Sequence, residues 1–186
     1  MPLTIRDKAD IAGTFRDVSI VLMETLARWV PATPELEVKT LFGRHIWDLA
    51  QHADWFGRRA AELRAALHYR RPPRTEYAAA LQELAQASGT GDRVAAFYDI
   101  ALTDLVARYG AFAAALDRLL DDPTLRIIER VLADAGRMAA DCADVRRARP
   151  DLPPADAVWL NGLRARFGTR DWVDFRPPAP SAEILA

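Results

Sequence analysis

Apolar residues recur every three or four positions through long segments of this chain, and that spacing decides which class of fold it can adopt. In the first segment, about Asp7 to Val30, the recurring residues are Ile11, Phe15, Val18, Leu22, Leu26 and Trp29. A period near 3.6 residues places such a stripe on one face of an α-helix. No stretch shows the alternation of apolar and polar residues that predicts a half-buried strand. The sequence therefore predicts an all-α protein.

Prolines and glycines divide the rest of the chain into further helical segments. A second long helix is expected to begin at Pro34, with Thr33 as its N-cap, and to run to about Tyr69. Three more helices are expected, over about Thr75 to Ala87, Arg93 to Leu120 and Thr124 to Ala148. Short turns make neighbouring long helices antiparallel, which predicts a four-helix bundle with an additional short helix.

The composition of the chain changes after Pro150. Residues 151–186 are rich in Pro, Arg and Trp and contain one short helical candidate, about Pro154 to Phe167. We therefore divide the chain into a helical bundle domain, residues 1–150, and a C-terminal extension, residues 151–186. The extension is expected to pack on the bundle or on a neighbouring subunit, which leaves a homodimer open.

The composition indicates which partners and which cellular compartment to expect. The 25 Lys and Arg residues nearly cancel the 26 Asp and Glu residues, so net charge gives no reason to expect nucleic acid or an anionic membrane. The single cysteine, Cys142, forms no internal disulfide. No apolar stretch approaches the length of a membrane span, and the N-terminus lacks the pattern of a signal peptide. We expect a protein of the reducing cytoplasm, with an arginine- and alanine-rich composition typical of GC-rich bacteria.

The segment GRHIWDLAQHADWFGRRAAELR, residues 43–64, carries two of the three histidines beside the apolar face of the second long helix. At about 100° per residue, His45 lies on the edge of the apolar arc and His52 just beyond it. Asp48 follows His45 by three residues and precedes His52 by four, so its carboxylate is in reach of either imidazole. Such a pairing raises the basicity of a histidine and fixes its tautomer. His45, Asp48 and His52 are therefore candidate acid/base residues.

This segment, followed by DDPTLRIIERVLADAGRM at residues 121–138, resembles a pattern in bacterial ferritin-like domain proteins. In that pattern a helix with histidines, acids and an HAD segment is followed by a helix that begins D-x-P-[ST]-x-R. The resemblance covers about residues 35–145. It implies a ferritin-like four-helix bundle.

The resemblance also raises the question of a metal site. Ferritin-like di-iron proteins use a Glu on each of two helices and a Glu-x-x-His on each of the other two. This chain contains no Glu-x-x-His, so a complete di-metal site is not expected. A smaller iron or manganese site would draw its ligands from Glu37, His45, Asp48, His52 and Glu129.

Two functions stay open at this point. The first is an enzyme that acts on a small organic molecule through the His/Asp site, as an oxidoreductase if it holds a metal or as an acid/base catalyst if it does not. The second is a non-catalytic bundle that binds a ligand or a protein. In that case the same residues form a hydrogen-bond network that fixes the register of the helices.

Overall fold

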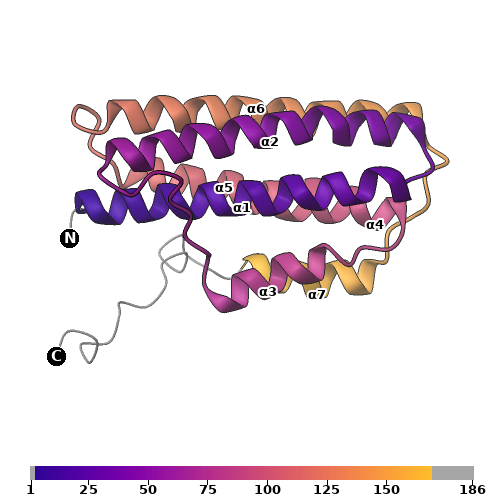
Figure 1. The fold of residues 1–186 in the computed structure, drawn as a ribbon. Helices are drawn as coiled ribbons and strands as arrows, with labels where there is room; N and C mark the ends of the chain where they lie inside the picture. Colours follow the sequence, from indigo (N-terminus) through magenta and orange to yellow (C-terminus); the bar gives the residue numbers. More distant parts are fainter. Residues whose placement is uncertain (1–2, 169–186) are drawn as a thin grey trace.

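The computed structural model describes residues 3–168, and this part of the chain is helical with no strand. Long helical segments lie side by side in a bundle (Figure 1), namely α1 (Ile5–Ala32), α2 (Leu36–Glu62), α6 (Asp122–Ala148) and a composite segment of α4 (Thr90–Val94), η1 (Ala95–Ala101) and α5 (Leu102–Ala114). Two shorter helices, α3 (Thr75–Leu84) and α7 (Ala157–Gly168), pack against each other on one side of this bundle. The all-α prediction is confirmed.

Aromatic rings fill the core between α1, α2 and α5. The ring centroid of Phe15 lies 5.2 Å from that of Phe56 and 4.7 Å from that of Tyr109. Burial of side chains of this size stabilises the fold by about 1.5–3 kcal/mol each. The stripe predicted for the first helix is the face that packs here, since its residues are all buried: Ile11, Phe15, Val18, Leu22, Leu26 and Trp29.

The junction between α1 and α2 differs from the sequence prediction. α1 continues through Pro31 to Ala32, and α2 begins at Leu36 with Glu35 at its N-cap position. The hydroxyl of Thr33 donates to the carbonyl of Trp29 at 2.8 Å, so this threonine ends α1. The prediction that Thr33 caps the second helix is wrong, because its side chain bonds backward to the preceding turn.

α2 ends at Glu62 and does not continue to Tyr69. Arg64 and His68 adopt positive φ angles of 67° and 62°, and this left-handed conformation breaks the helical path. Leu67, which the helical pattern places on the apolar face, is therefore exposed. The chain turns back at this point and runs beside α1.

The composite third segment departs from a regular α-helix within its first turns. Residues Ala95–Ala101 form a π-helix, and the segment ends at Ala114 instead of continuing to Leu120. A π-helical insertion changes the direction in which the following side chains point, and such insertions are frequent at functional sites. Here the π-helix contains Tyr98, whose hydroxyl contacts His45 of α2.

α3 and α7 are held to the bundle by a buried polar cluster. The Arg108 side chain of α5 donates to Asp104 at 2.7 Å and to the carbonyl of Phe167 at 3.3 Å. The hydroxyl of Tyr77 in α3 donates to the same Asp104 at 2.8 Å. This cluster connects α3, α5 and α7. The rest of the predicted C-terminal extension, residues 169–186, lies outside the described residues.

Replacing Gly91 by Ala is expected to destabilise the fold by about 1–3 kcal/mol, because the added carbon has no room. It would stand 2.1 Å from the carbonyl oxygen of Pro153, a backbone atom that moves only if the segment before α7 shifts. The matched control is Gly110→Ala, where nothing lies within 4 Å and alanine is expected to gain about 0.5–1 kcal/mol. Urea unfolding measures both, and equal effects at the two glycines would contradict the packing described here.

Candidate functional site

The two histidines of α2 point toward α6 and the π-helix, and their partners come from those elements. His45 Nδ1 lies 2.6 Å from the Tyr98 hydroxyl, and His45 Nε2 lies 3.4 Å from a carboxylate oxygen of Asp141. His52 Nε2 lies 3.2 Å from Asp134. A carboxylate only accepts hydrogen bonds, so we assign the proton of His45 to Nε2 and let Nδ1 accept from Tyr98.

Asp48 does not bond to either imidazole, so the sequence prediction of a His/Asp pairing within one helix is wrong. Its two carboxylate oxygens each accept a hydrogen bond of 3.1 Å from Arg137 of α6. Arg137 also donates to Asp134 at 2.7 Å. A bidentate guanidinium contact is stronger than a single bond to a neutral imidazole, which explains this choice of partner. Arg137 therefore bridges an acid of α2 and an acid of α6.

Burial decides the protonation states in this network. His45 is 0% exposed and His52 is 2% exposed. Burial lowers the pKa of both imidazoles from the ordinary value of 6.5, although hydrogen bonds to Asp141 and Asp134 act in the opposite direction. Burial also raises the pKa of the Tyr98 hydroxyl well above 10. At neutral pH both imidazoles are therefore uncharged and Tyr98 keeps its proton.

The lowered histidine pKa values predict that stability falls as the solution is acidified. Below a pH of 6.5 the unfolded chain binds protons at His45 and His52, whereas the folded chain binds them only at lower pH. The free energy of unfolding is expected to decrease as the pH falls below about 7.5, and to go on decreasing until the folded chain also binds these protons. Urea unfolding at a series of pH values measures this slope. A double variant, His45→Gln with His52→Gln, should lose most of it, and an unchanged slope would contradict the assignment.

The five residues predicted as metal ligands are not brought together. Glu37 is exposed and accepts a hydrogen bond of 2.6 Å from Arg149, and Glu129 is exposed on α6. Among residues 3–168, no group of three or more His, Cys, Asp or Glu side chains is placed to hold a metal ion. The Arg137 guanidinium already supplies the positive charge that pairs with Asp48 and Asp134. The donor set does not fit a metal, and no metal-dependent step follows from it.

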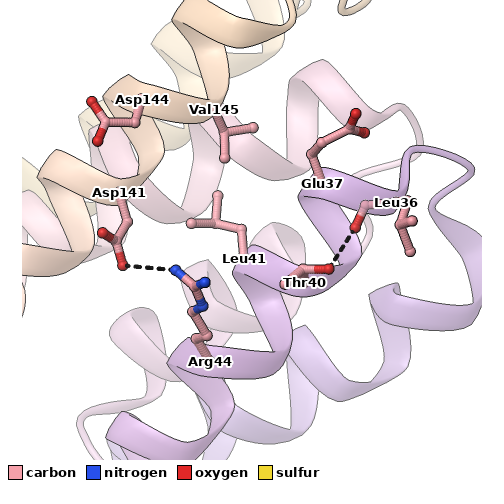
Figure 2. A pocket seen from close by; sticks show the side chains of 8 residues that line it. All are labelled: Leu36, Glu37, Thr40, Leu41, Arg44, Asp141, Asp144 and Val145. Carbon is pink, nitrogen blue, oxygen red and sulfur yellow. Dashed lines mark hydrogen bonds and ion pairs between the residues drawn. The ribbon is translucent and has the colours of Figure 1, made fainter.

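An open groove of about 380 Å³ lies beside this network, between the start of α2 and the end of α6. Figure 2 shows its lining residues, which are Leu36, Glu37, Thr40, Leu41, Arg44, Asp141, Asp144 and Val145. Leucine and valine side chains supply an apolar surface, and carboxylates stand around it. We call this the α2–α6 groove.

Asp141 belongs both to the groove and to the histidine network. Its carboxylate has two long contacts, 3.4 Å to His45 Nε2 and 4.0 Å to Arg44, and its side chain is 27% exposed. His45 itself has no exposed surface, so a molecule in the groove reaches the network only through Asp141. A molecule in the groove would therefore contact the acid on α6 and not the histidine on α2.

Tyr98, Arg137 and Asp141 were not identified as site residues from the sequence. A signal for two of them exists, because Asp134, Arg137 and Asp141 are spaced by three and four residues and so share one face of α6. The sequence gives a weaker indication for Tyr98. Its hydroxyl interrupts an apolar stripe, and a buried hydroxyl needs a hydrogen-bond partner.

Comparison of this chain with protein-family models, with curated proteins and with solved structures finds no match. Within residues 3–168, no helix has the length and apolar character needed to cross a membrane.

Proposed function

We propose that this protein binds a small organic molecule with an apolar body and a cationic group in the α2–α6 groove. The observation that carries the proposal is the state of Asp141. It is a partly exposed carboxylate on the groove wall, and both of its contacts within the described residues are longer than 3 Å. A ligand ammonium group would give it a shorter, charge-assisted hydrogen bond.

The other acids of the groove are already paired, which singles out Asp141 as the anchor. Glu37 accepts a bond of 2.6 Å from Arg149, and Asp144 accepts one of 2.8 Å from Arg147. Arg44 is 66% exposed along its side chain and touches Asp141 only at 4.0 Å, so a ligand cation displaces it at little cost.

The apolar part of the ligand has its own surface in the groove. Leu41 is buried at the groove floor and Val145 is half-buried beside it. Leu36 is 72% exposed at the groove edge and gains cover when a ligand binds. Apolar contact of this kind contributes about 25 cal/mol for each Å² removed from water.

In this proposal the histidine network positions the anchor. The Tyr98 hydroxyl holds the ring of His45, and His45 Nε2 holds the carboxylate of Asp141. The chain of hydrogen bonds runs from the protein core to the groove wall. His45 and Tyr98 are therefore positioning residues for Asp141, and His52 and Asp48 fix α2 against α6 through Asp134 and Arg137.

Calorimetry with three matched probes tests the proposal. Hexylamine is expected to bind, whereas hexanol and hexanoate, which share its chain but lack its positive charge, are expected to bind at least about tenfold more weakly. Asp141→Asn should remove the preference for hexylamine. Asp122→Asn, an exposed acid elsewhere on α6, should keep it. Equal binding of the three probes, or an unchanged preference in Asp141→Asn, would refute the proposal.

A second candidate function, acid/base catalysis without metal, is favoured by the contact between Asp141 and His45. Asp141 would touch the substrate and accept its proton, and His45 would stabilise the carboxylate by donating from Nε2. Aminoacetone, which has an ammonium group and acidic C–H bonds, is a suitable probe. If the protein is a catalyst, it should speed up the exchange of the carbon-bound hydrogens of aminoacetone for deuterium in heavy water. His45→Gln should abolish this acceleration. If aminoacetone binds but its hydrogens exchange no faster, binding without catalysis is the function that remains.

A ferritin-like fold and a cytoplasmic location belong to the same proposal. The order of the long helical segments and the polar side chains between α2 and α6 support the ferritin-like fold. Cys142 is a buried free thiol whose pKa is raised by burial to about 11, and a reducing compartment suits it.

Titration with Fe²⁺ and Mn²⁺ tests whether the chain lacks the metal site of ferritin-like proteins. We expect no stoichiometric binding that depends on His45 and His52.

A further inference from the structure

A second groove, of about 370 Å³, lies at the other end of α2, where α1 and the segment after α2 approach each other. Its lining residues are Arg16, Asp54, Gly57, Arg58, Ala61, Glu62, Leu67 and His68. None of them lines the α2–α6 groove. We call it the Arg16 groove.

The guanidinium of Arg16 has fewer partners than its donors need. One of its terminal nitrogens donates to the carbonyl of Tyr69 at 3.3 Å. Its Nε is buried without a hydrogen-bond partner. Leaving a buried donor unpaired costs about 1–3 kcal/mol. The two terminal nitrogens make the single hydrogen bond to Tyr69, so donors remain there for an acceptor that is not part of the chain.

The guanidinium of Arg16 packs against Gly57 of α2. A Cβ at Gly57 would stand 2.9 to 3.0 Å from three atoms of the Arg16 guanidinium, so the group packs closely against the glycine. Arg16 also lines the groove, so a ligand there can contact the part of its guanidinium that is not packed on Gly57. The edges of a guanidinium, which carry its N–H donors, are the part of an arginine that pairs with a carboxylate in a two-pronged contact.

The carboxylates of the groove do not neutralise Arg16. Asp54 pairs with Arg58 at 2.9 Å, and Glu62 pairs with Arg59 at 2.9 Å. Arg16 forms no ion pair with any acid of residues 3–168. The positive charge beside the groove is therefore free to pair with an anion from solution.

The segment after α2 forms one wall of the groove in an unusual backbone conformation. Arg64 and His68 both have positive φ, which costs a residue other than glycine of the order of 1 kcal/mol. Tyr69 fixes the segment, because its hydroxyl donates to Asp10 at 2.8 Å and its ring packs on Gly13 of α1. In this conformation Leu67 is exposed and forms an apolar part of the groove wall.

We propose that the Arg16 groove is a binding site for a small organic monocarboxylate. The carboxylate pairs with the guanidinium of Arg16, and the apolar body lies against Ala61 and Leu67. Inorganic phosphate has no apolar body that could lie against Ala61 and Leu67. The apolar wall therefore favours an organic carboxylate over phosphate.

NMR on the full chain tests the proposal with benzoate, its neutral analogue benzamide, and inorganic phosphate. Benzoate is expected to shift the Nε–H signal of Arg16 and the amide signals of Gly57 and Ala61 in a saturable way. Benzamide and phosphate are expected to bind at least about tenfold more weakly. This comparison uses the unaltered protein, so no folding defect affects it. Phosphate binding as tight as that of benzoate, or equal shifts with benzamide, would overturn the proposal.

Variants locate the site. Arg16→Gln should weaken benzoate binding by at least about tenfold, and Arg16→Lys, which keeps the charge but loses the planar fork, by a smaller factor. The matched control is Arg6→Gln, also on α1, whose side chain is 71% exposed and pairs with Asp10. It should bind benzoate as the unaltered chain does. Unchanged affinity in Arg16→Gln would place benzoate elsewhere.

Gly57→Ala provides an independent check of the geometry. The new methyl group meets the guanidinium, whose side chain is long enough to move away. The affinity for benzoate is therefore expected to change by a factor of about three or more, with a shift of the Arg16 Nε–H signal in the free protein. An unchanged signal and an unchanged affinity would contradict the placement of Arg16 over Gly57.

Discussion

Asp104→Ala is expected to lower the free energy of unfolding by about 3–5 kcal/mol, because it removes the carboxylate that pairs with the buried guanidinium of Arg108. Arg108 is 2% exposed and donates to Asp104 at 2.7 Å. Its guanidinium also lies 4.8 Å from the ring centroid of Tyr77, which interacts favourably with the charge but does not replace the carboxylate. Tyr77 loses the acceptor of its hydroxyl in the same substitution.

The measurement is urea unfolding of Asp104→Ala beside a matched variant, Asp122→Ala. Asp122 pairs with Arg126 across the same i, i+4 spacing, but both side chains are at least half exposed. An exposed pair contributes about 0–1 kcal/mol, so the control isolates the effect of burial. A loss below about 1 kcal/mol in Asp104→Ala would show that the cluster joining α3, α5 and α7 is not the buried ion pair described here.

His45→Ala is expected to cost about 3 kcal/mol or more, the second of the two largest effects. The substitution removes a side chain with no exposed surface and leaves a cavity between α2 and the π-helix. It also leaves the buried hydroxyl of Tyr98 without its 2.6 Å partner. Because His45 holds Asp141, the same variant should weaken hexylamine binding.

A histidine at the surface supplies the comparison for His45. His68 is exposed and has a positive φ of 62°, a conformation that asparagine adopts readily. His68→Asn is therefore expected to change the unfolding free energy by less than about 0.5 kcal/mol. His45→Gln, which keeps a polar side chain, should be less harmful than His45→Ala. Equal losses in His45→Ala and His68→Asn would mean that the network does not stabilise the fold.

The class of fold could be predicted because the spacing of apolar residues shows which face of each helix is buried. The stripe from Ile11 to Trp29 faces the core as predicted. The same periodicity placed Leu67 in a helix that ends at Glu62, since nothing in the pattern signals that Arg64 adopts a positive φ. The π-helix at Ala95–Ala101 was missed for a related reason. Its apolar residues suit an α-helix equally well.

The place of the two histidines at the core-facing side of α2 was predicted, but their hydrogen-bond partners were not. At about 100° per residue, His45 and His52 fall at the edge of the apolar face, and the structure buries both there. Asp48 was the expected partner because the spacing along one helix says nothing about residues on its neighbours. The partners Asp134 and Asp141 lie on α6, and only the packing of α6 against α2 brings them close.

We propose that a cationic organic molecule binds in the α2–α6 groove beside Asp141. Intermolecular NOE spectroscopy on methyl-labelled protein with bound hexylamine tests this placement. The methylene protons of the probe should give NOEs to the methyl groups of Leu41 and Val145, which line the groove. NOEs to Leu67 at the Arg16 groove instead, or no NOEs to either groove at saturating hexylamine, would contradict the claim.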